Sequence, residues 1–94
     1  MTVTVKFVGS FRSLSGQDKL ALKIENVATF REVVKKIVKE LPKLEQALID
    51  PECESPKTNM LVLVNGKEIG VLNGLETAIK DGDEMVFVPV VHGG

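Results

Sequence analysis

The sequence has little of what most catalytic and metal sites are built from. It contains one cysteine, Cys53, one histidine, His92, and four aromatic residues, all of them phenylalanine. A single cysteine excludes an internal disulfide and a site with several thiolate ligands. A single histidine leaves no histidine metal cluster. Because His92 stands third from the end, we do not expect it in the core of a conventional Ser-His-Asp site. Because Glu52 and Glu54 flank Cys53 and disfavour its thiolate, we expect a surface thiol without a catalytic role, and no metal site.

An excess of one charge and a long apolar run are missing as well. The 12 basic and 13 acidic residues give a formal net charge of −1, so no overall field attracts nucleic acid or an anionic membrane. The longest apolar run is far shorter than the ~18 residues that a membrane helix needs. The opening letters MTVTVKFVGSF alternate and do not resemble a signal peptide. We therefore expect a cytoplasmic protein that contacts neither a membrane nor, directly, nucleic acid.

The first half of the chain predicts two strands and a helix. Residues 2–8 and 19–25 alternate apolar and polar side chains, as half-buried strands do, and the Gly- and Ser-rich segment 9–18 predicts the loop of an antiparallel hairpin. An α-helical stripe follows, with Thr29 and Glu32 in the spacing of a capping box and a proline at the end. The apolar residues of this stripe, expected to pack on the hairpin, are Phe30, Val33, Val34, Ile37, Val38 and Leu41.

The second half begins with a connector and a hairpin. Residues 42–58 contain three prolines and predict a connector with a short helix over 44–50. Residues 60–64 are continuously apolar and predict a buried strand. The Asn65-Gly66 dipeptide that follows predicts a tight turn into a short edge segment.

The last strand decides the fold class. Residues 72–84 predict a loop with a helical turn. Residues 85–91 are apolar on both faces, and an exposed edge strand of that composition would aggregate. We therefore expect residues 85–91 in the centre of the sheet. The order β-β-α-β-β-β predicts an α+β domain of two layers, a mixed sheet with one main crossover helix. We expect a single ubiquitin-like β-grasp domain over residues 1–94, with a flexible C-terminal Gly-Gly tail at 91–94.

Two features remain as candidates for function. Asp81, Asp83 and Glu84 surround a turn glycine, which indicates turn chemistry and solubility, or else docking to a basic partner. The sequence ends on Gly93-Gly94. Either this ending is a frayed tail without a role, or its terminal carboxylate is itself the working group.

The sequence resembles the MoaD/ThiS group of ubiquitin-like sulfur carriers along nearly its whole length. The ending is the most specific part, since it combines DGDE, an apolar strand and a terminal Gly-Gly. The matching segments are VTVKFVGSFRSLSG, TFREVVKKIVKELP, MLVLVNGKEI and IKDGDEMVFVPVVHGG.

The resemblance implies a protein that is not catalytic alone. The Gly94 carboxylate would be adenylated by a ubiquitin-activating-type adenylyltransferase that uses ATP, and then converted to a thiocarboxylate. As the small subunit of molybdopterin synthase, the protein would donate its sulfur in molybdenum cofactor biosynthesis with a MoaE-type large subunit, and it would bind no cofactor stably. The residues implied in partner binding are Gly93, His92, Val91, Val90, Pro89, Val88 and Phe87.

The sequence departs from the MoaD pattern at two positions. Val90 follows Pro89 where the group has a second proline, and His92 stands where a small residue is usual, which is closer to the ubiquitin-related modifiers that thiolate transfer RNA. Other acceptors therefore stay open: transfer RNA, thiamine thiazole, and lysines of other proteins, as for archaeal small modifiers. A binding or scaffold domain with an incidental Gly-Gly is a further alternative.

Overall fold

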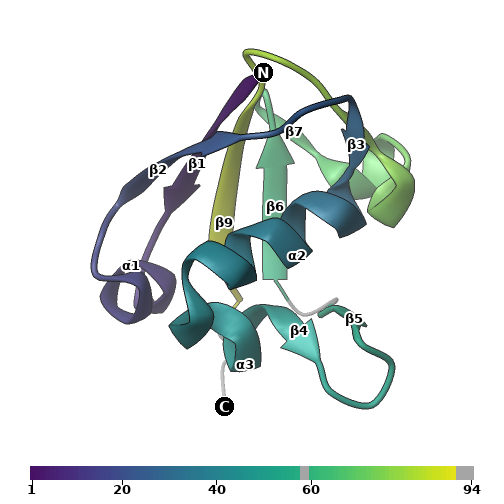
Figure 1. Ribbon diagram of the computed structural model, residues 1–94. Coiled ribbons are helices and arrows are strands. Elements are labelled where there is room, and N and C mark those ends of the chain that lie inside the picture. The colour runs from purple at the N-terminus through teal and green to yellow at the C-terminus, as the bar shows by residue number, and fades with distance from the viewer. Residues whose placement is uncertain (58–59, 91–94) are drawn as a thin grey trace.

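The computed structural model describes residues 1–57 and 60–90, and a five-stranded sheet forms its centre (Figure 1). The strand order is β2-β1-β9-β6-β7. Strands β1 and β9 are parallel and the other neighbours are antiparallel. The last strand is thus central, as predicted, and the mixed sheet of the β-grasp arrangement is confirmed. The bounds are β1 (Thr2–Phe7), β2 (Lys19–Lys23), β6 (Met60–Val64), β7 (Lys67–Glu68) and β9 (Glu84–Pro89).

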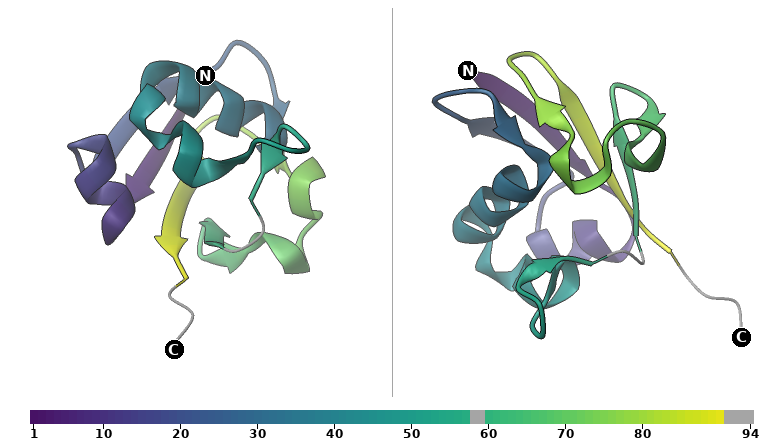
Figure 2. Two further views of the ribbon diagram at one scale, coloured as in Figure 1. Left: turned by 90° about the horizontal axis from the view of Figure 1, so that it is seen from below. Right: turned by 90° about the vertical axis from the view of Figure 1, so that its right-hand side faces the viewer.

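Helix α2 (Phe30–Glu40) forms the second layer and covers one face of the sheet (Figures 1 and 2). The predicted capping box is present. The Glu32 N–H donates to Thr29 Oγ1 at 3.2 Å, and the Thr29 N–H donates to Glu32 Oε1 at 3.0 Å. These contacts satisfy N–H groups that the first turn leaves without intrahelical partners. Together they set where the helix begins.

The core lies between α2 and the inner face of the sheet. Its centre is Phe87 of β9, whose ring stacks on Phe30 at a centroid distance of 5.9 Å and lies 6.1 Å from the ring of Phe7. The apolar stripe of α2 contributes to the same core, as its spacing predicts, with Val38 and Leu41 only partly buried against it. The buried residues of the two layers include Val3, Val5, Leu22, Ile24, Val33, Val34, Ile37, Val62, Val64 and Met85.

The predicted loop between β1 and β2 contains a helix, α1 (Ser10–Ser15). Gly9, with φ of 61°, turns the chain out of β1, and Gly16, with φ of 76°, ends the helix by donating its N–H to the Arg12 carbonyl at 3.0 Å. Phe11 anchors α1 and is buried. The sequence did not predict this helix for two reasons. The segment is rich in Gly and Ser, and a six-residue helix is too short to show a helical stripe.

The remaining connections are short and partly as predicted. The short helix expected over 44–50 is divided between a 3-10 turn and α3, and its Leu44 and Leu48 are fully buried. The helical turn expected in 72–84 is η3, whereas the pairs β3–β8 and β4–β5 are not indicated by the sequence. The bounds are β3 (Ala28–Thr29), η1 (Pro42–Leu44), α3 (Glu45–Leu48), β4 (Ile49–Asp50), β5 (Ser55–Pro56), η2 (Ile69–Val71), η3 (Gly74–Glu76) and β8 (Ala78–Ile79).

Strand β6 is not buried throughout, which corrects the prediction. Val62 and Val64 face the core and are buried, whereas Leu61 and Leu63 are partly exposed on the other face. Side chains alternate across a strand, and within residues 1–57 and 60–90 the long helix covers one face of the sheet (Figure 2, right). Every second residue of the run therefore points outward.

Candidate partner-docking surface at the end of the central strand

Half of the predicted site can be placed in the structure. Phe87, Val88 and Pro89 end strand β9, and Val90 follows it. The other predicted residues, Val91, His92, Gly93 and Gly94, lie outside the described residues.

Phe87 supports the strand from inside. Its side chain is 0% exposed and packs against Phe30 and Phe7. Its carbonyl accepts a hydrogen bond from the Val8 N–H at 3.2 Å, which continues the parallel β1–β9 ladder. A partner on the surface therefore cannot touch this ring, and we assign Phe87 the task of holding the strand in register.

The opposite face of the sheet carries an apolar surface that we call the outer patch, made of Leu61, Leu63, Val86 and Val88. All four side chains are partly exposed. The register places Leu61 beside Val88 and Leu63 beside Val86, so the four side chains are adjacent. Contiguous apolar surface rimmed by polar groups is typical of protein–protein contact. The outer patch is therefore a candidate docking surface.

Two further valines extend the apolar surface at the end where β9 stops. Val8 is 44% exposed and Val90 is 45% exposed. Val90 was predicted as a partner contact and its exposure suits that task. Leu61 and Leu63 were missed, although the signal was present: a continuous apolar strand in a fold of two layers has to expose alternate side chains.

The position of Pro89 is fixed by a close approach of the chain to Gly9. A Cβ atom at Gly9 would lie 3.1 Å from Pro89 Cγ, and Gly9 also has a φ of 61°. Both facts favour glycine over any other residue at position 9. The residue that precedes α1 thus lies close to the last residue of β9.

The acidic cluster at the other end of the sheet performs turn chemistry. Asp81 Oδ1 accepts the Thr2 N–H at 2.8 Å, and Asp83 Oδ2 accepts the Lys80 N–H at 2.8 Å. Asp83 Oδ1 also accepts from Asn65 Nδ2 at 2.9 Å. The interpretation of this cluster as turn chemistry is therefore confirmed. The Asp83 carboxylate joins the β6–β7 turn to the start of β9.

The part of the chain that the structure describes offers no group of three or more His, Cys, Asp or Glu side chains that would hold a metal ion. Cys53 is exposed and unpaired at the tip of the β4–β5 connection. Among residues 1–57 and 60–90, no helix has the length and apolarity needed to cross a membrane.

The mixed five-stranded sheet with a capped crossover helix on one face defines a ubiquitin-like β-grasp domain. The chain belongs to the ThiS family, which it matches over residues 5–94. It is 33% identical over 94 residues to small archaeal modifier protein 3 of Haloferax volcanii, and the match covers all of both chains.

Solved structures show the same fold. SAMP1 of Haloferax volcanii superposes with a TM-score of 0.87 at 22% identity, over 100% of both chains. A putative molybdopterin converting factor, subunit 1, of Pyrococcus furiosus gives a TM-score of 0.74 at 24% identity, over 97% of this chain and 99% of the other. At these identities the likeness concerns the fold alone.

Proposed function

We propose that this protein is a ubiquitin-like carrier whose Gly94 carboxylate is adenylated and then converted to a thiocarboxylate. The observation that carries the proposal is the central, parallel position of β9, which leads from the core to the Gly-Gly sequence and ends beside an exposed apolar surface. The family match extends to residue 94. The full-length match to a small modifier protein also supports it.

The chemistry explains why a second protein is needed. A carboxylate is a poor acyl donor because its oxygen leaves badly, and adenylation supplies a good leaving group. A carboxylate oxygen of Gly94 attacks the α-phosphorus of ATP and releases pyrophosphate; a sulfur nucleophile then displaces AMP. We assign ATP to a ubiquitin-activating-type adenylyltransferase, and this chain needs no stably bound cofactor.

The chain's own contribution is to present the reactive segment and to be recognised. The outer patch supplies apolar contact area beside Val90, while Phe87 and Gly9 hold the end of β9 in position. Glycines at positions 93 and 94 have no Cβ atoms that would collide with the walls of an enclosed site. His92 and Val91 are assigned to contacts with the same partner.

The first proposed destination of the sulfur is molybdopterin, with this chain as the small subunit of molybdopterin synthase and a MoaE-type protein as the large one. The ending IKDGDEMVFVPVVHGG supports this role. The fold shared with the Pyrococcus furiosus protein is compatible with it. The same activated terminus would serve transfer RNA or thiamine thiazole if the acceptor enzyme differed.

A second candidate function is the modification of lysines through Gly94. The 33% identity to small archaeal modifier protein 3 over the full length of both chains favours it. The two candidates share the adenylate and diverge at the next nucleophile, which is sulfur in one case and a lysine amine in the other. One protein can serve both purposes.

Intact mass spectrometry tests the shared step. The protein is incubated with its adenylyltransferase, ATP and a sulfide donor, and the expected product has one oxygen replaced by sulfur at Gly94. An unchanged mass with no adenylate would contradict the proposal. Co-purification with a MoaE-type subunit would then favour molybdopterin synthesis, and Gly-Gly remnants on lysines of other proteins would favour modification.

A further inference from the structure

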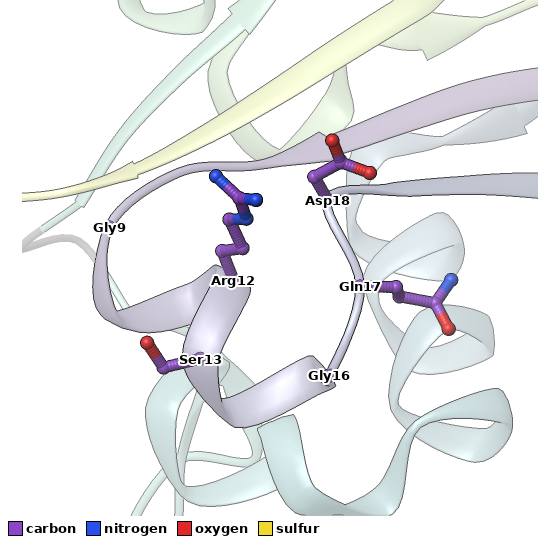
Figure 3. Close-up of a pocket in the computed structure, with 6 residues that line it drawn as sticks. All are labelled: Gly9, Arg12, Ser13, Gly16, Gln17 and Asp18. Atoms are coloured by element: carbon purple, nitrogen blue, oxygen red, sulfur yellow. The ribbon is translucent and has the colours of Figure 1, made fainter.

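A groove runs beside the end of β9, between α1 and the outer face of β1. Three of its lining residues are apolar, Phe7, Val8 and Val86, and four are charged: Lys6, Arg12, Asp18 and Lys19. A second hollow adjoins it and shares Arg12 and Asp18. Figure 3 shows Arg12 and Asp18 extending toward β1 from α1 and from the loop after it, while Gln17 points away.

The charges in this groove are only partly compensated inside the molecule. Lys6 Nζ pairs with Glu84 Oε2 at 3.1 Å. Within residues 1–57 and 60–90, Arg12 and Lys19 take part in neither of the ion pairs, and their side chains make no hydrogen bond to another residue. Two exposed cations therefore face the groove against one carboxylate, in a chain whose overall net charge is −1. The excess of positive charge is therefore a property of this groove and not of the whole chain.

The mixture of groups selects a protein segment as the ligand. The planar fork of an arginine binds a carboxylate through two parallel hydrogen bonds. Asp18 beside it repels a phosphate dianion but accepts an N–H donor of a peptide. Val8 and Val86 offer contact to an apolar side chain. A segment that carries carboxylates next to apolar residues matches all of these groups.

We propose that this groove binds an acidic segment of the enzyme that activates Gly94. The inference rests on the proposed function. Val86 belongs to both the groove and the outer patch, so one partner can cover both without a break. Gly9 contacts Pro89 at this same end of the sheet, and a protein that receives the residues after Val90 has to approach here. The groove supplies the charged part of the contact and the outer patch the apolar part.

The test is steady-state adenylation, measured as ATP–pyrophosphate exchange with the adenylyltransferase and full-length variants of this protein. Arg12→Glu is expected to raise the KM for this protein by about ten-fold or more with kcat unchanged, because a charge at an interface acts on encounter and affinity rather than on the reacting atoms. Arg12→Ala is expected to have a smaller effect in the same direction. Arg12→Lys, which keeps the charge, is expected to stay nearest to wild type.

Lys67→Glu is the matched control. Lys67 is exposed, and it follows the Asn65-Gly66 turn at the end of the sheet away from Pro89. The substitution changes the net charge by the same amount, and its KM is expected to stay within about two-fold of wild type. Raising NaCl from about 50 mM to about 500 mM is expected to bring wild type and Arg12→Glu together, because salt screens exposed charges.

The outcomes separate the two proposals. No exchange with the wild-type protein would overturn the proposed function, and this inference with it. Exchange that is equal for wild type and Arg12→Glu, with both proteins folded by circular dichroism, would overturn this inference alone. Equal losses in Arg12→Glu and Lys67→Glu would also overturn it, because they would reflect general charge and not this groove.

Discussion

The two ends of the central sheet are held together by different forces. At the turn end, polar side chains bind backbone and side-chain groups: Asp81 binds Thr2, Asp83 binds Lys80 and Asn65, and the Glu84 N–H donates to Asn65 Oδ1 at 2.9 Å. At the end where β9 leaves the sheet, the inner face is closed by phenylalanine packing instead. The first end uses its polar groups for stability, and the second leaves its polar and apolar surface available to a partner.

Removing the central ring tests the packed end and has the largest expected effect on stability. Phe87→Ala is expected to lower the free energy of unfolding by about 3–5 kcal/mol, because it opens a cavity beneath Phe30 and Phe7. Urea denaturation measures the change. Val88→Ala, its neighbour on the partly exposed face, is the control, with an expected loss of about 1 kcal/mol or less. Equal losses for the two variants would contradict the assignment of Phe87 to the core.

Removing a turn carboxylate tests the polar end. Asp83→Ala deletes acceptors for the Lys80 N–H and for Asn65 Nδ2. A loss of about 1–2 kcal/mol is expected, since each net hydrogen bond contributes about 1 kcal/mol and water replaces part of it at an exposed site.

Asp18→Ala is the matched control for that variant, because the Asp18 carboxylate makes no hydrogen bond or ion pair within the described residues. It is expected to leave stability nearly unchanged in the same denaturation experiment. If Asp83→Ala were as stable as wild type, the hydrogen bonds of Asp83 would not be what stabilises the turn end of the sheet.

Substitutions in the outer patch test whether the exposed face of the sheet serves binding rather than stability. Replacing Leu61 and Val88 together by serine is expected to raise the KM for adenylation by about ten-fold or more, because binding energy concentrates in buried apolar contacts at interface centres. Thermal unfolding is expected to change little. Ala21→Ser, an exposed change on β2, serves as the control. Wild-type KM in the double variant would remove the patch from the interface.

The smallest expected effect concerns the pH dependence of the α2 cap. The hydrogen bonds from the Thr29 backbone and hydroxyl hold the pKa of Glu32 below its ordinary value of 4.5. Because the folded-state pKa is the lower one, this stabilisation is present above pH 4.5 and is lost as the pH falls through the folded-state pKa.

Glu32→Gln keeps an acceptor for the cap but does not titrate. The difference in Tm between wild type and this variant is therefore expected to shrink between about pH 7 and about pH 3. Thermal unfolding followed by circular dichroism at a series of pH values measures it. A difference that grows on acidification would contradict the capping role of the carboxylate.

The periodic parts of the chain could be predicted from the sequence, and the aperiodic parts could not. The capped stripe of α2 was predicted correctly because repeated spacing reports which face is buried. The central place of β9 was predicted correctly because an exposed edge strand of that apolar composition would aggregate. Helix α1 was missed because a single anchor, Phe11, gives no period. Leu61 and Leu63 were interpreted as core because residues 60–64 are apolar at every position, although a sheet covered on one face by a single helix layer exposes alternate side chains. The groove at Arg12 depends on three segments meeting, which local patterns do not encode.

The most direct measurement compares the wild-type protein with a variant that lacks Gly94, under the same adenylation conditions. Intact mass and thermal unfolding are recorded for both. A carrier whose terminal carboxylate is the reactive group gains sulfur in the wild type and not in the shortened variant, while the two unfold at nearly the same temperature. Sulfur incorporation in the variant, or a large loss of its stability, would contradict the central claim.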